Sequence, residues 1–177
     1  VQNMTINTNG SAKYGVQFYN STGGELIGVI INGGYYSSVN VNASEVDMTN
    51  CTLNPGTGSY ATIDYSIGSA EGLDRIPAIK LNNVTTNNAG GLKIWADNAT
   101  VERAQALLEP GDNVAAAIRD KIDTKNNDAV LVSIEVTEGG APADITIPST
   151  KPVIPVTPDD DDDTPSYSGG SSSSETS

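Results

Sequence analysis

Turn-forming residues divide the first 96 residues into many short segments. The turns are rich in glycine and asparagine: Asn9-Gly10, Gly23-Gly24, Asn32-Gly33-Gly34, Asn54-Pro55-Gly56 and Ala89-Gly90-Gly91. These residue types tolerate the backbone conformations of tight turns. The segments between them are apolar or alternate in polarity, which is typical of strands. We predict strands at Met4–Thr8, Lys13–Tyr19, Glu25–Ile31, Tyr36–Val41, Val46–Leu53, Tyr60–Ser66, Ile76–Leu81 and Leu92–Ala96.

The spacing of these strands predicts a mainly β fold. Many short strands at near-regular intervals are typical of an antiparallel β-sandwich, either Ig-like or jelly-roll-like. The alternation around Val39 and Val41 places the intervening polar residues, including Asn42, on the solvent face. Asp128–Thr137 has the clearest alternation in the chain and is predicted to be a central strand.

The spacing of apolar residues changes between residues 100 and 123. Apolar residues recur at helical spacing on both sides of Pro110-Gly111, which predicts one or two short helices. Asp112 is a candidate cap for the second helix. An alternative interpretation makes Asn113–Ile118 a strand that follows the Pro-Gly-Asp turn.

Seven Asn-X-Ser/Thr sequons lie before residue 101, where about three would be expected by chance. Their asparagines are Asn3, Asn9, Asn20, Asn42, Asn50, Asn83 and Asn98. A glycosylated asparagine must be exposed on a secreted protein. The sequons, and a chain that starts at Val1 rather than Met, predict an extracellular, cell-surface glycoprotein whose signal peptide has been removed.

Composition narrows the chemistry that is expected. The net charge of −13 disfavours binding to nucleic acid or anionic lipid, and no apolar run is long enough to span a membrane. The chain has no histidine, so the usual hydrolase triads and most transition-metal sites are excluded. We expect no enzyme activity and no cofactor. The single Cys51 is interpreted as a buried apolar residue, with an intermolecular disulfide as the alternative.

Three groups of residues are weaker candidates for chemistry. Weak calcium binding by Asp123–Asp128 or Asp159–Asp163 is one hypothesis, although neither has the ligand pattern of an EF-hand. Asp64, Glu71 and Asp74 include a candidate carboxylate pair for glycoside hydrolysis. The aromatic residues form either a carbohydrate-stacking platform or part of the core. They are Tyr14, Phe18, Tyr19, Tyr35, Tyr36, Tyr60 and Tyr65. Trp95 lies on the strand before the helical region and is expected to anchor that junction.

Composition also divides the chain into three parts. Residues 1–140 form the predicted glycosylated domain, 141–158 are rich in proline, and 159–177 combine aspartates with glycine and serine. Proline at this density enforces an extended backbone. The C-terminal part is interpreted either as a stalk or as a segment that adds a strand to a neighbour.

One stretch resembles a known family. Leu108-Glu109-Pro110-Gly111-Asp112-Asn113-Val114, followed by the strand Ala129–Thr137, is similar to the Leu-X-Pro-Gly-Asp turn and following strand of TasA-like surface fibre proteins. That family includes the bundling pili of archaea. The resemblance implies a β-sandwich subunit in which an extended segment of one copy completes the sheet of the next. The chain departs from the pattern in its alanine-rich helical segment and its long acidic tail.

These observations predict a structural subunit of an archaeal surface filament, sheath or layer that polymerises with itself. Apolar residues near both ends are candidates for the subunit interface because isolated alternating segments suit strand addition. They are Met4, Ile6, Ile145, Ile147, Val153, Ile154 and Val156. An alternative to strand donation is that both ends pack on their own domain. The alternative function is a carbohydrate- or surface-binding adhesin module displayed on a stalk.

Overall fold

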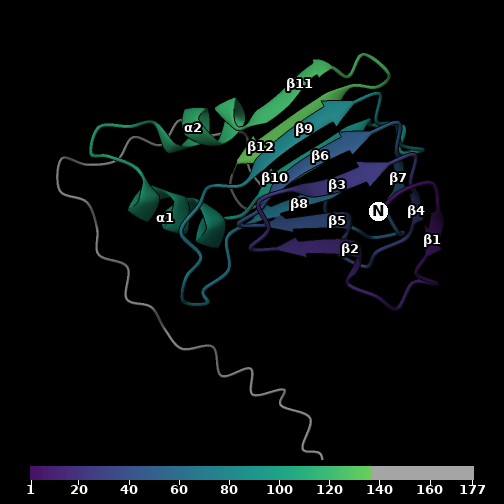
Figure 1. The fold of residues 1–177 in the computed structure, drawn as a ribbon, viewed down its shortest axis with the longest axis horizontal. Helices are drawn as coiled ribbons and strands as arrows, with labels where there is room; N and C mark the ends of the chain where they lie inside the picture. The colour runs from purple at the N-terminus through teal and green to yellow at the C-terminus, as the bar shows by residue number, and fades with distance from the viewer. Residues whose placement is uncertain (137–177) are drawn as a thin grey trace, which may run out of the picture.

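The computed structural model describes residues 1–136, which form a coil of parallel strands (Figure 1). Sheet B contains β1 (Thr5–Asn7), β4 (Ile30–Asn32) and β7 (Thr52–Asn54). Sheet C contains β2 (Tyr14–Tyr19), β5 (Ser37–Asn42), β8 (Ile63–Ser66), β10 (Leu92–Ala96) and β12 (Val132–Val136). Sheet A contains β3 (Gly24–Ile27), β6 (Glu45–Thr49), β9 (Ala78–Asn82) and β11 (Ile122–Asn126).

The predicted antiparallel β-sandwich is wrong. All strand pairs are parallel, and the chain visits sheets B, C and A in rotation from β1 to β9, after which β10, β11 and β12 alternate between sheets C and A. Each strand therefore pairs with the strand one full coil later, so the described residues form a parallel β-solenoid. The predicted strand positions were largely correct, but Glu25–Ile31 and Val46–Leu53 each contain a corner that divides them into two strands on different sheets. The helical prediction for 100–123 is confirmed by α1 (Asn98–Leu107) and α2 (Val114–Asp120).

Left-handed backbone conformations make the corner between sheets A and B. Asn3, Gly28, Asn50 and Asn83 have φ angles of 50°, 63°, 53° and 54° and occupy this corner in successive coils. The N–H of each of the first three bonds to the coil above, to the carbonyls of Ile27, Thr49 and Asn82 respectively. Asparagine and glycine adopt positive φ more readily than other residues. The same preference serves the tight turns of hairpins. Gly28 and Asn50 lie inside the predicted strands Glu25–Ile31 and Val46–Leu53, so the sequence does not predict these corners.

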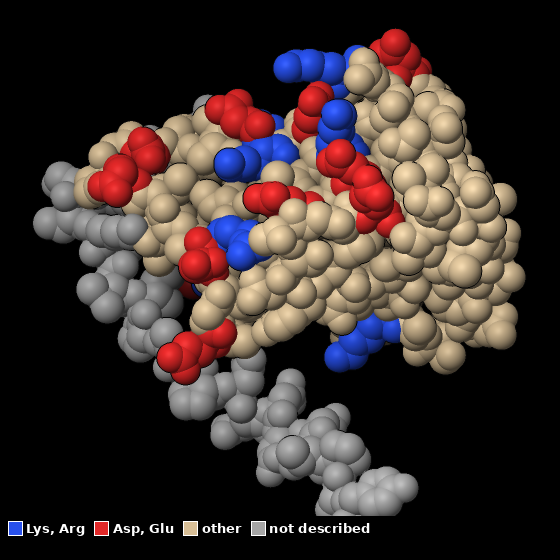
Figure 2. All heavy atoms as spheres, viewed as in Figure 1, with Lys and Arg blue, Asp and Glu red and all other residues tan. Residues whose placement is uncertain are grey.

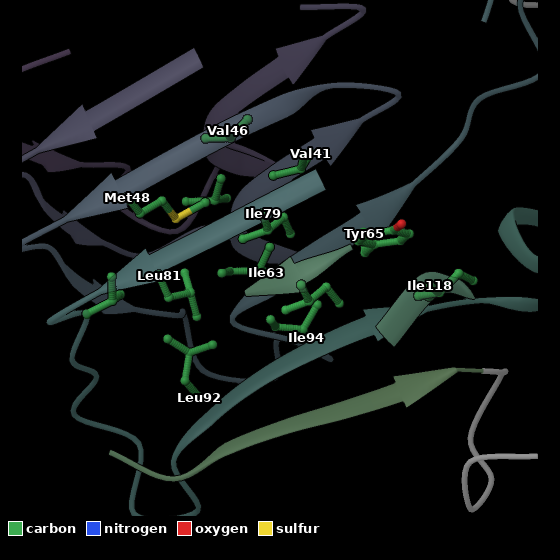
Figure 3. Packing of buried hydrophobic residues seen from close by; sticks show 14 of the residues in the cluster. Val41, Val46, Met48, Ile63, Tyr65, Ile79, Leu81, Leu92, Ile94 and Ile118 are labelled. Carbon is green, nitrogen blue, oxygen red and sulfur yellow. The ribbon is translucent and has the colours of Figure 1, made fainter. Parts of the chain in front are cut away.

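The core is a set of apolar columns inside the coil (Figure 3). Leu26, Met48 and Leu81 are register partners in sheet A, and all are fully buried. In sheet C, Val39, Ile63 and Ile94 form a parallel column of the same kind. Ile118 of α2 is also fully buried in this cluster. Stacking identical or similar residues in this way buries a continuous core that no single coil could form.

Strand β12 differs from its prediction as a central strand. It lies at the end of sheet C, where β10 is its partner within residues 1–136. The sequence does not predict strand β11, because its residues fall within the candidate calcium loop Asp123–Asp128 and at the end of the predicted helical region. In the structure, β11 pairs with β9, and Asp123 accepts a hydrogen bond from the backbone N–H of Lys125 at 3.0 Å.

Candidate functional site

Two insertions interrupt the regular coil at the same corner. Residues 67–77 are inserted between β8 and β9, and residues 97–121, which contain both helices, are inserted between β10 and β11. Both begin at the carboxyl end of a sheet C strand. In repeat proteins, insertions on one face commonly build the binding face. Here they wall a cleft of about 310 Å³ on the outer surface of sheet C.

The floor of the cleft is one row of outward-facing residues. Gln17, Asn40, Asp64 and Trp95 are register partners on four neighbouring strands. Gln17 Nε2 donates to Asn40 Oδ1 at 3.0 Å, and Asn40 Nδ2 donates to Asp64 Oδ2 at 3.0 Å and to Ser66 Oγ at 2.8 Å. This network fixes the side chains of the floor before any ligand arrives.

Asp64 is the centre of that network. The hydroxyls of Tyr14 and Tyr60 donate to its Oδ2 atom at 3.0 and 3.1 Å. Burial raises the pKa of the Asp64 carboxyl, and these hydrogen bonds oppose the rise. Burial and the neighbouring Asp64 charge also raise the pKa of both tyrosines, so their hydroxyls remain protonated donors.

Aromatic rings continue from the floor along one side. Tyr60 and Trp95 have ring centroids 4.6 Å apart and nearly perpendicular planes, at 74°. Tyr36 packs against Tyr60 at 5.4 Å and against Tyr14 at 6.0 Å. These contacts hold Tyr60 and Trp95 rigidly beside the Asp64 carboxylate, with both rings lining the cleft.

The opposite wall comes from the insertions. Asp97 caps α1, where its Oδ1 atom accepts from the N–H of Thr100 at 2.8 Å. Arg103 lies on the same helix and donates through Nη1 to the carbonyl of Ile67 at 2.7 Å. Asn42 accepts from the N–H of Gly68 at 2.8 Å. The helix and the shorter insertion are therefore joined to each other and to the sheet.

The sequence analysis located only part of this site. It proposed Asp64 together with Glu71 and Asp74, but the latter two are exposed in the shorter insertion and do not line the cleft. Of the aromatic residues proposed as a platform, Tyr14 and Tyr60 line the cleft, whereas Tyr65 belongs to the core and donates to the Pro77 carbonyl. Trp95, which was expected to anchor a junction, also lines the cleft. It missed Gln17, Asn40, Asp97 and Arg103. A search for polar residues at equivalent positions of a repeat would have grouped Gln17 with Asn40.

The seven predicted glycosylation sites have different surroundings. Six of them are exposed: Asn3, Asn9, Asn20, Asn50, Asn83 and Asn98. Asn42 is half-buried and engaged in the cleft wall, and its sequon partner Ser44 is fully buried. Asn3, Asn50 and Asn83 occupy the same corner, where Gly28 lies in the coil between Asn3 and Asn50. A structural need for positive φ is thus sufficient to explain part of the excess of sequons.

The two predicted interface residues at the N-terminus differ in their packing. Ile6 lies in β1, where it is half-buried beside Ile31, while Met4 is 48% exposed. The other candidates, Ile145, Ile147, Val153, Ile154 and Val156, lie outside the described residues, as does Asp159–Asp163. Cys51 is buried, and its thiol donates to the carbonyls of Leu26 and Thr49, both at 3.3 Å.

Residues 1–136 contain neither a metal-binding cluster nor a membrane-spanning helix. In residues 1–136, no group of three or more Cys, Asp or Glu side chains is arranged to hold a metal ion. Neither α1 nor α2 is long and apolar enough to cross a membrane. Comparison with known proteins is also negative: no family model matches the chain, and neither a curated protein nor a solved structure shows significant similarity to it.

Proposed function

We propose that this chain is a glycan-binding module that acts outside the cell, with the cleft on sheet C as its binding site. One observation carries the proposal: both insertions lie at the same corner of the coil. Together they form the wall of a cleft whose floor is a row of amide, carboxylate and aromatic side chains. This was the alternative function predicted from the sequence. The sequons support an extracellular location.

The chemistry of the cleft suits a sugar. Sugar rings present hydroxyls at their edges and C–H groups on their faces. Gln17, Asn40 and Asp64 offer donors and acceptors for hydroxyls, while Tyr60 and Trp95 offer rigid faces for apolar contact. A pre-formed cleft with a few fixed polar groups is the usual form of a small-ligand site.

Binding to immobilised polysaccharides and to a glycan array tests the proposal. Trp95→Ala should weaken binding about tenfold, because it removes one aromatic contact. Leu131→Ala is the control, since Leu131 is 73% exposed and does not line the cleft. Absence of binding by the unmodified chain, or an equal effect of both variants, would refute the proposal.

A filament subunit remains a second candidate, favoured by one observation. Strands β1 and β2 lie at one end of their sheets, and their outer edges have no strand partner within residues 1–136. An open edge can accept a strand from another copy. If Ile145–Val156 supplies that strand, the double variant Ile145→Asp with Ile147→Asp should abolish fibres in electron micrographs. Discrete monomers of the unmodified chain at all concentrations would rule this candidate out.

A further inference from the structure

The carboxylate at the centre of the cleft is surrounded by neutral donors. Asp64 accepts from two phenol hydroxyls and one amide, and none of these groups carries a positive charge. A carboxylate withdrawn from water is costly unless an opposite charge accompanies it. The hydrogen bonds reduce that cost, but they do not neutralise the charge.

The cations nearest to the cleft are engaged elsewhere. Arg103, which lines the cleft, donates to the Ile67 carbonyl. Lys93, on the strand beside Asp64, is paired with Glu135 at 2.8 Å, and its ammonium nitrogen lies 5.6 Å from the centroid of the Trp95 ring. The second carboxylate of the cleft, Asp97, adds to the negative charge and acts on Asp64 by repulsion. The charged groups that line the cleft are therefore two carboxylates, Asp64 and Asp97, and one guanidinium, Arg103, so the lining is net negative and can accept a positive charge from outside the chain.

The aromatic groups favour the same kind of ligand. Tyr60 and Trp95 meet nearly at right angles beside Asp64, so two rings and one carboxylate border the same space. Ring faces attract cations, most strongly when water is excluded, and an ammonium group beside a carboxylate gains a charge-assisted hydrogen bond as well. A uronic acid in this space would instead face two carboxylates, Asp64 and Asp97, with Arg103 as the cation of the lining.

We infer that the glycan taken by this cleft contains an amino sugar with a free ammonium group, and that Asp64 is the counter-ion that selects it. This inference rests on the proposed glycan-binding function and names its ligand class. Asn40, Tyr14 and Tyr60 then act as positioning residues, since they hold the Asp64 carboxylate by its Oδ2 atom.

Calorimetric titration of the full chain with three oligosaccharides of equal length tests the inference. The probes are a glucosamine hexamer, its N-acetylated counterpart and a galacturonate hexamer, at mildly acidic pH where the amine is protonated. The glucosamine hexamer should bind about tenfold more tightly than the neutral one, as expected for one charged hydrogen bond, and the galacturonate should bind least.

A matched pair of variants locates the selectivity. Asp64→Asn should lower affinity for the glucosamine hexamer to that for the neutral hexamer. Asp47→Asn, which removes the same charge from an exposed position on sheet A, should leave the preference intact. The comparison of the three sugars uses the unmodified chain and remains decisive even if a variant is unstable.

The outcomes separate the two proposals. Equal or tighter binding of the neutral or acidic hexamer would overturn the amino-sugar assignment while supporting a glycan-binding cleft. Tighter binding of a lysine oligopeptide than of the glucosamine hexamer would also overturn it, in favour of a peptide ligand. Failure of all three sugars to bind would overturn the proposed function and this inference together.

Discussion

At the scale of single residues, Asp64 links stability to pH. Its folded-state pKa is raised above the ordinary value of 3.8, mainly by burial. Between those two pKa values the native state binds more protons than the unfolded state, so stability falls as pH rises through this window. Above this window, the folded unmodified chain bears a constant free-energy cost for burying the ionised Asp64 carboxylate. The Asp64→Asn variant has no such cost.

The expected result is therefore a stability difference that depends on pH. Urea unfolding should show Asp64→Asn gaining stability relative to the unmodified chain as pH rises from below 4 to neutrality. Asp47→Asn, on the exposed face of sheet A, should show no comparable trend. A gain that shrinks over the same range would contradict the assigned direction of the Asp64 pKa shift.

Cys51 allows a second prediction at this scale. Cys51 follows the corner residue Asn50, and its thiol is buried. Burial raises the pKa of this thiol, so little thiolate exists near neutral pH. In the native protein it should react with a thiol reagent only as fast as the chain unfolds, and at full speed in urea. Rapid labelling under native conditions would instead support the alternative of an accessible cysteine and an intermolecular disulfide.

At the scale of elements, asparagine side chains connect the strands of sheet B. Asn54 Nδ2 donates to Asn32 Oδ1 at 2.8 Å, and Asn32 Nδ2 donates to Asn7 Oδ1 at 2.9 Å. Asn32→Ala removes both bonds and should cost about 1–2 kcal/mol of unfolding free energy, whereas Asn7→Ala removes one and should cost about half as much. Denaturant unfolding of the two variants measures both losses of unfolding free energy. Equal losses would show that the two asparagine hydrogen bonds do not contribute separately to stability.

The corner between sheets A and B limits glycosylation. Asn83 Nδ2 donates to Asn50 Oδ1 at 2.9 Å, and neighbouring coils are only about 4.8 Å apart. A sugar ring is about as wide as that spacing, so two glycans cannot leave both asparagines side by side without a clash. Glycopeptide mass spectrometry combined with intact mass should find folded molecules with a glycan at Asn50 or Asn83, and full occupancy of both would refute this limit.

The elements also show what the sequence could and could not predict. Strand positions followed from alternation, and both helices followed from their period, because these patterns are local. Strand direction did not follow, because an asparagine or glycine with positive φ fits a hairpin as well as a solenoid corner. The decisive signal was the recurrence of Asn-X-Thr at Asn3, Asn50 and Asn83, which was interpreted as glycosylation rather than as a repeat.

The site was harder to predict than the fold, for a physical reason. Its floor residues are distant in the chain and meet only because parallel stacking brings position 17 beside 40, 64 and 95. Without the register, Asp64 was one carboxylate among many. Its hydrogen bonds to Tyr14 and Tyr60 could not be foreseen from spacing alone.

At the scale of the whole molecule, charge is distributed unevenly. The strands of sheet B contain no charged residue, and the corresponding side of the molecule, on the right in Figure 2, is almost free of charge. Asn3, Asn50 and Asn83 lie at the corner where this sheet begins. Glycans at Asn3 and at either Asn50 or Asn83 would cover a surface that lacks charge, which gives the predicted modification a physical role in solubility.

The stacked architecture also predicts a gradient of stability. In a solenoid each coil is stabilised by its neighbours, so an end coil with one neighbour opens more readily. Within residues 1–136, β2 lies at the end of sheet C and has no fully buried residue, whereas the next strand, β5, is almost entirely buried. Native-state hydrogen exchange should therefore show lower protection in β2 than in β5.

The same experiment distinguishes the two candidate functions. If the chain acts as a monomeric binding module, the difference in protection between β2 and β5 should be independent of protein concentration. If it is a filament subunit that accepts a strand at this edge, β2 should become protected as fibres form, because its outer edge gains hydrogen-bonded partners. Equal hydrogen-exchange protection of β2 and β5 in dilute monomer would contradict the expectation that an end coil with one neighbour opens more readily.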